Sequence, residues 1–287
     1  MISKPVSQAL LLTAIGTSTA IFLATLGMPQ QETLFAGLSL VIIVGVVIGE
    51  RMIPFRKDWN QPQGDVAGDI GSFVLIFGAL DAGLKWGTPF LILALLPDRP
   101  LVLGLPLWQQ VVVAFVLIEF GAWISHYAHH KYQSLWALHA MHHSPRRVYS
   151  LNNFRFHPLN HALNHAAMML VPLALGLSKQ ALLAYVAITL PILLLQHSNM
   201  AFDFGRLNWL INTNAAHRWH HSADPRVGPK NLGRALLVFD HVFGTFYLPD
   251  YQSAPPKVGL FARDSLFPKA RHLLRQLAWP FHPDCCR

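Results

Sequence analysis

The sequence predicts an all-α integral membrane protein with about four transmembrane helices and a re-entrant hairpin, capped by a cytosolic histidine-rich helical unit. Three observations predict this fold class. Of the 287 residues, 53% are apolar and only 13% are charged, whereas soluble domains usually carry about 25% charged residues. Long uncharged runs recur along the chain. Thirteen of the 16 histidines fall between residues 126 and 221, mostly in polar segments outside these runs.

Four apolar runs predict transmembrane helices, at residues 7–27, 34–49, 70–96 and 107–125. A helix rises about 1.5 Å per residue, so about 20 residues cross a hydrocarbon core of roughly 30 Å. The second run is short, with 16 residues. The third run contains Asp81 and Lys85, which lie one helical turn apart and are placed to pair inside a bundle.

Two further apolar runs, at residues 166–177 and 180–196, flank Ser178 and Lys179. The first of them has 12 residues, which as a helix is about 18 Å long and too short to cross a bilayer. We interpret the pair as the re-entrant hairpin, and a true pair of spans is the alternative.

The distribution of basic residues predicts the orientation. Cytosolic loops of membrane proteins carry an excess of Lys and Arg. With the N-terminus in the cytosol, 19 of the 22 basic residues lie on the cytosolic side, and the loop at 28–33 has none. This orientation places every histidine cluster on the cytosolic side and His126 where lipid chains meet water. Because the basic residues are segregated in this way, the net charge of +8 indicates a membrane and not a nucleic-acid partner.

The spacing of the histidines predicts a metal site. The three clusters are His126 and His130; His139, His142 and His143; and His217, His220 and His221. Helical residues three and four apart share a face, and imidazole is the commonest metal-ligating side chain. Eight imidazoles exceed the four ligands of a zinc ion and suit two ions with open positions. His197, in "QHSN", is a ninth candidate ligand, and the roles of His129, His157, His161 and His165 stay open.

The order of the motifs then resembles a known superfamily. The segments are "HYAHH", "LWALHAMHHS", "NNFRFHP", "QHSN", "NTNAAHRWHHS" and "FDHVFGT". Over roughly residues 105–250 they resemble the fatty acid hydroxylase / sterol desaturase superfamily of membrane enzymes. The resemblance implies that the three histidine boxes hold two iron ions. It also implies that the enzyme uses O2 and two external electrons to hydroxylate or desaturate a C–H bond of a membrane lipid.

The resemblance also implies a domain organisation and a partner. Residues 1–104 are expected to form a membrane-spanning region, 105–250 the catalytic domain and 251–287 a cytosolic surface tail. The chain has no flavin or haem motif such as G-x-G-x-x-G after a strand, so a separate electron-donor protein is expected. Carboxylates are expected to orient the ligands, and the candidates are Glu119, Asp224 and Asp240.

Two departures from the family pattern weaken any inference about the substrate. Tyr127 stands where the family often has Arg, and "NLG" at 231–233 stands where it has Asn-Tyr-Gly. Imidazole also accepts zinc, so the alternative is a zinc-holding or metal-transporting membrane protein without redox chemistry. A transporter places its ligands near the bilayer midplane, whereas these clusters lie outside the spans. The lipid substrate, the choice between hydroxylation and desaturation, the electron donor and the oligomeric state are left open.

Overall fold

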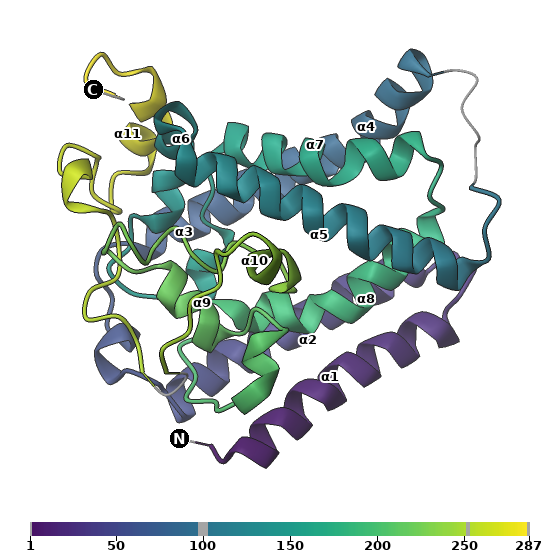
Figure 1. The fold of residues 1–287 in the computed structure, drawn as a ribbon, viewed down its shortest axis with the longest axis horizontal. Coiled ribbons are helices and arrows are strands. Elements are labelled where there is room, and N and C mark those ends of the chain that lie inside the picture. The colour runs from purple at the N-terminus through teal and green to yellow at the C-terminus, as the bar shows by residue number, and fades with distance from the viewer. Residues whose placement is uncertain (1, 97–102, 251–252, 286–287) are drawn as a thin grey trace.

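The fold is helical throughout the described chain (Figure 1). The computed structural model describes residues 2–96, 103–250 and 253–285. The helices are α1 (Lys4–Ala24), α2 (Gln31–Met52), α3 (Val66–Phe73), α4 (Asp81–Leu95), α5 (Leu107–Lys131), α6 (Gln133–His143), α7 (Pro158–Ala174), α8 (Lys179–Gln196), α9 (Asn214–His220), α10 (Val238–Val242) and α11 (Leu273–Ala278). Within these ranges there is no sheet strand, only three isolated β-bridges.

Five helical segments are long and apolar enough to cross a membrane. Four of them confirm the predicted spans: α1, α2, the segment Val66–Leu95 and α5. In the third, a π-helical segment (Val74–Leu80) joins α3 to α4, and the predicted ion pair forms, with Lys85 Nζ 2.6 Å from the Asp81 carboxylate. The fifth is α8, the second arm of the predicted hairpin.

The first arm of the hairpin, α7, is longer than its apolar run. It begins at Pro158, eight residues before that run, because the His157 side chain accepts a hydrogen bond from the Leu159 N–H and caps the helix. Proline is favoured at this first position, where its missing N–H costs nothing. Both arms pack against α5, and in Figure 1 α7 lies above α5 and α8 below it. The long helix α5 therefore organises the centre of the bundle.

Close packing of α5 on α7 depends on a glycine. A Cβ atom at Gly121 would lie 2.2 Å from the backbone oxygen of Ala167 on α7. No side chain tolerates such a distance from a backbone atom, so a residue without a side chain is required at this crossing. This contact fixes the position of the C-terminal half of α5, which carries His126 and His130.

The histidine-rich unit lies at one end of the bundle, together with the start of the chain. In Figure 1, α6 and α11 lie at the upper left, α9 lies below them, and the start of the chain lies lower still on the same side. The backbone N–H of Ile2 donates to the Ala201 carbonyl at 2.9 Å, and the Gln8 amide donates to the Phe204 carbonyl at 2.9 Å. The start of the chain and the histidine-rich unit therefore lie on the same side of the bundle.

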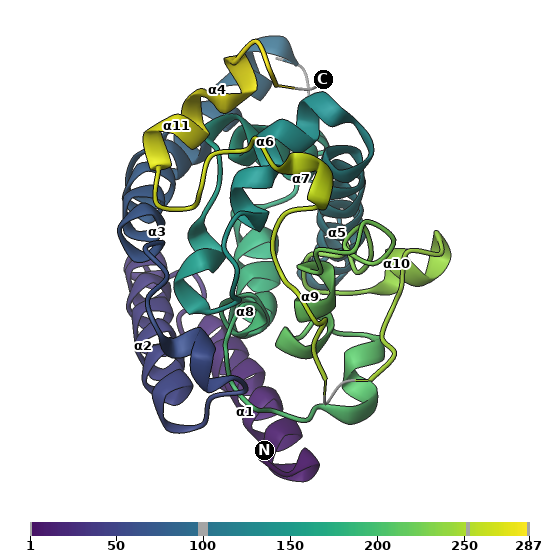
Figure 2. The ribbon, with the colours of Figure 1, turned by 90° about the vertical axis from the view of Figure 1, so that its left-hand side faces the viewer.

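The C-terminal segment, expected as a surface tail, instead folds onto α6 (Figure 2). Phe261 and Phe267 are buried with Trp136 in one apolar cluster. The Arg155 guanidinium donates to the Ala270 carbonyl at 2.5 Å and to the Gln276 side chain at 2.6 Å. Part of this segment therefore packs against the histidine unit, while Leu274 and Phe281 of the same segment remain exposed.

Candidate metal centre

Nine histidines converge in two groups. The first contains His126, His130, His139, His143 and His220, and the second contains His142, His197, His217 and His221. In each group one ring nitrogen per residue lies within 4.8 Å of the others. The structure thus brings together all nine residues that the sequence predicts as ligands. It also divides them: α6 and α9 supply residues to both groups, α5 only to the first, and the end of α8 only to the second.

The rings of each group face one another through their Nε2 atoms. In the first group, the Nε2 atoms of His139 and His143 are 3.2 Å apart. In the second, the Nε2 of His217 lies 2.9 Å from that of His197. The groups adjoin, because the ring centroids of His143 and His221 are 4.5 Å apart. Two neighbouring sites for cations follow from this arrangement.

Five of the nine rings are oriented by a hydrogen bond from Nδ1 to an oxygen atom. The pairs are His126 with Leu232 O (2.8 Å), His139 with Asn160 Oδ1 (3.1 Å), His142 with Arg155 O (3.1 Å), His197 with Asn152 Oδ1 (2.6 Å) and His220 with Lys230 O (2.9 Å). An imidazole that donates from Nδ1 keeps its lone pair on Nε2. Such an acceptor behind the ring is the usual companion of a metal-ligating histidine.

Several nitrogens in the two groups are buried without a hydrogen-bond partner in the described part of the chain. They are both ring nitrogens of His130, the Nε2 of His220 and the Nδ1 atoms of His143 and His217. An unsatisfied buried polar atom costs about 1–3 kcal/mol. Cations between the rings would bind the unpartnered lone pairs of His130 and His220, so the residues fit a pair of metal ions.

The rings are neutral near pH 7. Burial lowers the pKa of His142 and of His220 to about 3. Burial lowers the pKa of His143 and His221 well below the ordinary value, and repulsion between protonated neighbouring rings adds to this effect. A neutral imidazole has the free lone pair that a metal ion requires.

Comparison with known proteins agrees with this geometry. A family model described as fatty acid hydroxylase matches residues 111–245. The ornithine lipid hydroxylase OlsE of Rhizobium tropici is 33% identical over 253 residues, which cover 85% of this chain and 74% of that protein. The chain belongs to the fatty acid hydroxylase family.

Other members of the fatty acid hydroxylase family match a smaller part of the chain. The alkylglycerol monooxygenases of Danio rerio and Homo sapiens are 28% identical over 134 residues and 27% identical over 140 residues. These matches cover 47% and 46% of this chain but only 30% and 29% of those proteins. No solved structure matches the chain.

In this member of the fatty acid hydroxylase family, no carboxylate of the described residues is hydrogen-bonded to a histidine of the two groups, contrary to expectation. Glu119 accepts hydrogen bonds from the Tyr185 hydroxyl at 2.6 Å and from the backbone N–H of Leu236 at 2.9 Å. Asp240 accepts from the backbone N–H of Leu232 at 2.8 Å. Asp224 forms an ion pair with Arg226 near the surface. The oxygens that contact the rings are carbonyls and amides, which leave the positive charge of bound metal ions uncompensated.

The "NLG" segment at 231–233 begins a loop whose backbone N–H groups donate to Asp240 and, at residues 235 and 236, to Glu119. Asn231 has a left-handed φ of 54°, a conformation that asparagine tolerates better than most residues. Gly233 is also required, because a Cβ atom there would lie 2.0 Å from the Leu236 carbonyl oxygen. The carbonyls of Lys230 and Leu232 accept the Nδ1–H groups of His220 and His126, so this loop orients a histidine in each of two boxes.

The four histidines of open role lie outside the two groups. His129 bonds through Nδ1 to the Ser125 carbonyl, and His157 caps α7 and bonds to the Leu277 carbonyl. The Nε2 of His161 lies 3.3 Å from the Asp81 carboxylate. The Nε2 of His165 lies 3.0 Å from the Thr88 hydroxyl. The last two contacts join α7 to the segment Val66–Leu95, so they are structural.

Sequence reasoning missed the partners that support the site. Arg147 and Arg155 form buried ion pairs with Asp65 and Asp69, respectively. Asn152 was visible in the "NNFRFHP" motif, but its partner His197 lies 45 residues away in the chain. Only the fold shows such a contact.

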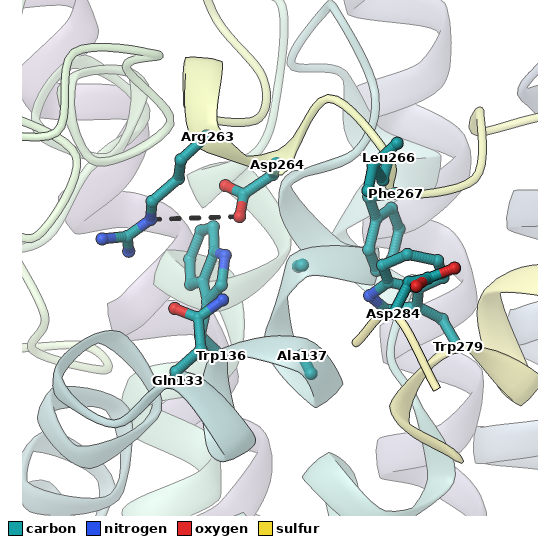
Figure 3. Close-up of a pocket in the computed structure, with 10 residues that line it drawn as sticks. Gln133, Trp136, Ala137, Arg263, Asp264, Leu266, Phe267, Trp279 and Asp284 are labelled. Atoms are coloured by element: carbon teal, nitrogen blue, oxygen red, sulfur yellow. Dashed lines mark ion pairs between the residues drawn. The ribbon is translucent and has the colours of Figure 1, made fainter. Parts of the chain in front are cut away.

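A pocket of about 280 Å³ adjoins the centre on the side of the C-terminal segment (Figure 3). In Figure 3, Trp136 of α6 lies beneath Arg263 and Asp264, with Phe267 and Trp279 across the pocket. The Trp136 ring is 5.0 Å from that of His130 and 5.3 Å from that of His143. This tryptophan therefore separates the pocket from the histidines.

Proposed function

We propose that this chain is a membrane-bound di-iron oxygenase that hydroxylates a C–H bond of a lipid. The observation that carries the proposal is the convergence of nine neutral histidines, eight of them buried, in two adjoining groups that contain no carboxylate among the described residues. The relationship to an ornithine lipid hydroxylase and to alkylglycerol monooxygenases supports lipid hydroxylation as the activity.

The net reaction is R–H + O2 + 2 e⁻ + 2 H⁺ → R–OH + H2O, with the electrons supplied by a separate donor protein. When bound, iron supplies the capacity to reduce dioxygen, which zinc lacks because it has no redox chemistry. The histidines of the first group would hold one ion and those of the second group the other. Neutral ligands leave nearly the full charge of both ions available for this chemistry.

The chain's own residues keep the centre rigid and close to the bilayer. The Nδ1–H bonds to carbonyl and amide oxygens fix the ring planes before a metal binds, which lowers the cost of ordering the ligands. His126 and His130 lie in the last two turns of a spanning helix. A lipid therefore reaches the centre from the membrane surface, on the side that we propose to be cytosolic.

The relatives suggest which lipids to test first. OlsE is named for its action on an ornithine lipid, so we propose an amino-acid-linked membrane lipid as the first substrate class. The alkylglycerol monooxygenases are named for an ether lipid, which is the second class. Total lipid extracts of cells with and without the protein, compared by mass for added oxygen, would identify the substrate.

Heavy-isotope dioxygen tests the chemistry. Membranes that contain the protein are incubated with iron, a reductant and ¹⁸O2, and the lipids are analysed by mass. We expect one labelled oxygen in a new hydroxyl group. A product that is two hydrogens lighter and unlabelled would indicate a desaturase. Activity without O2, or with zinc in place of iron, would falsify the oxygenase and favour the zinc-holding alternative.

A pair of matched variants tests the metal site. We expect about two metal ions per chain in the purified protein and a loss of both metal and activity in His220→Ala. His241 lies outside both groups and bonds to the Trp209 carbonyl, so His241→Ala is the control and retains both. A His220→Ala protein with the full metal content would contradict the assignment.

A further inference from the structure

A second pocket, of about 240 Å³, opens onto the first histidine group. Six of its lining residues are Tyr127, His130, Lys131, Leu232, Phe261 and Arg263, and two prolines of the turn after the third histidine box complete it. His130 is 7% exposed, and both its ring nitrogens are buried without a hydrogen-bond partner in the described part of the chain. The pocket therefore leads to a polar side chain of the proposed metal site.

The Lys and Arg side chains that line this pocket give it a positive charge. Lys131 and Arg263 are cationic, and the lining residues include no carboxylate. Arg263, which also lines the first pocket, forms an ion pair with Asp264 at 3.9 Å, and Asp264 does not line this second pocket. Both cations are exposed at the mouth of the pocket, and cations of one sign gathered at a cleft attract an anionic group.

A row of packed aromatic side chains extends from this pocket to the outer face of α5. Tyr127 stacks on Trp123 with ring centroids 5.3 Å apart, and Trp123 stacks on Phe243 at 4.4 Å. Phe243 follows α10 and is 51% exposed. It also lies beside Phe120 on the outer face of the spanning helix α5. Aromatic residues are favoured where lipid chains meet water. A ligand in the pocket that extends over this aromatic row toward the bilayer is expected to have an apolar part.

We propose that this pocket binds the anionic head group of a lipid, a carboxylate or a phosphate, through Lys131 and Arg263, and that these two residues determine which lipids reach the first histidine group. This inference deepens the proposed function. It rests on that function only where it takes the bound lipid to be the substrate of the enzyme. Phe261 and Arg263 lie beyond residue 245, where the family match ends. Selection of the head group therefore depends partly on the C-terminal segment.

Two probes that differ only in charge test the proposal. N-dodecanoylglycine carries a carboxylate, and in N-dodecanoylglycinamide a neutral amide replaces that carboxylate. Both probes carry a photoreactive diazirine in the acyl chain, next to the amide that joins the chain to glycine. The metal-loaded protein in phosphatidylcholine nanodiscs is labelled without O2 or reductant, so no turnover is needed. We expect the charged probe to label peptides that contain Tyr127–Lys131 or Phe261–Arg263. In the double variant K131Q/R263Q this labelling should fall about tenfold.

The controls separate charge, lipid and fold. Arg275 is exposed on the same C-terminal segment and does not line the pocket, so Arg275→Gln should label as the unaltered protein does. The neutral probe should label the unaltered protein and the double variant equally weakly. Excess N-acetylglycine, which has the carboxylate without the chain, should not compete. An unchanged metal content in the double variant establishes that it is folded.

Several results would overturn the proposal. They are equal labelling by the two probes, labelling that survives K131Q/R263Q, or competition by N-acetylglycine as effective as that by unlabelled N-dodecanoylglycine, which would indicate a site for free anions. Charge-dependent labelling in a protein that does not hydroxylate lipids would leave the pocket assigned and reject only the proposed function. Lipid hydroxylation combined with charge-independent labelling would support the proposed function and reject the assignment of this pocket.

Discussion

At the scale of single residues, the site depends on the oxygen atoms that orient five of its nine rings as well as on the rings themselves. Asn160 accepts the Nδ1–H of His139 through its Oδ1, and its Nδ2 has no partner in the described part of the chain. We expect Asn160→Ala to weaken metal binding about 10- to 100-fold, as removal of such a partner usually does. Asn160→Asp keeps the acceptor and should restore binding.

Metal retained per chain after dialysis against a graded chelator measures this effect. The control is Asn153→Ala, because Asn153 donates to the Leu193 carbonyl and is not hydrogen-bonded to a histidine in the described contacts. Equal metal retention by Asn160→Ala and the unaltered protein would show that the orientation of His139 does not limit binding.

The neutral histidines also predict how the metal-free protein responds to pH. Burial lowers the pKa of His142 and of His220 to about 3 in the folded state, whereas unfolded histidine titrates near 6.5. Below about pH 6.5 the unfolded chain binds more protons, so the free energy of unfolding falls as the pH falls. Each such histidine contributes about 1.4 kcal/mol per pH unit until its folded pKa is reached.

Thermal unfolding of the chelator-treated protein in detergent, recorded between pH 7.5 and 5, measures this dependence. We expect the unfolding temperature to fall steadily below pH 6.5 and to change little above it. An unfolding temperature that stays constant over this range would mean that the rings keep contact with water, contrary to their burial in the structure.

At the scale of helices, the crossing of α5 and α7 positions the first histidine box. The backbone of α7 lies where a Gly121 side chain would be, so Gly121→Ala forces the two helices apart. Overpacking of this kind costs about 1–3 kcal/mol. We expect a lower unfolding temperature together with loss of metal, because His126 and His130 move with α5.

Gly16→Ala in α1 is the matched control. No atom lies within 4 Å of a Cβ built at Gly16, and alanine favours a helix over glycine by about 1 kcal/mol. This variant should unfold at the same or a higher temperature. If the two variants behave alike, the α5–α7 contact does not depend on the missing side chain.

At the scale of the whole molecule, the side of the membrane on which the centre lies is a prediction from the charge distribution. Nineteen of 22 basic residues fall on one side of the proposed topology. With Cys285 and Cys286 replaced by serine, a cysteine at Gln30 should react with an impermeant thiol reagent added to sealed cells. Cysteines at Gln133 or Arg226 should react only after the membrane is opened. Labelling of position 133 from outside would reverse the topology and move the electron donor to the other side.

The sequence by itself determined the fold class, the four spans and which histidines converge. These depend on local properties: an apolar run long enough to cross a bilayer, and a spacing of three or four residues that places side chains on one helix face. The tertiary structure decided how the nine histidines divide into two groups, because residues of one box, such as His142 and His143, belong to different groups. It also decided which atoms orient the rings. Acceptors such as Asn152 and the Leu232 carbonyl are distant in sequence from their partners, and a backbone oxygen has no sequence signature.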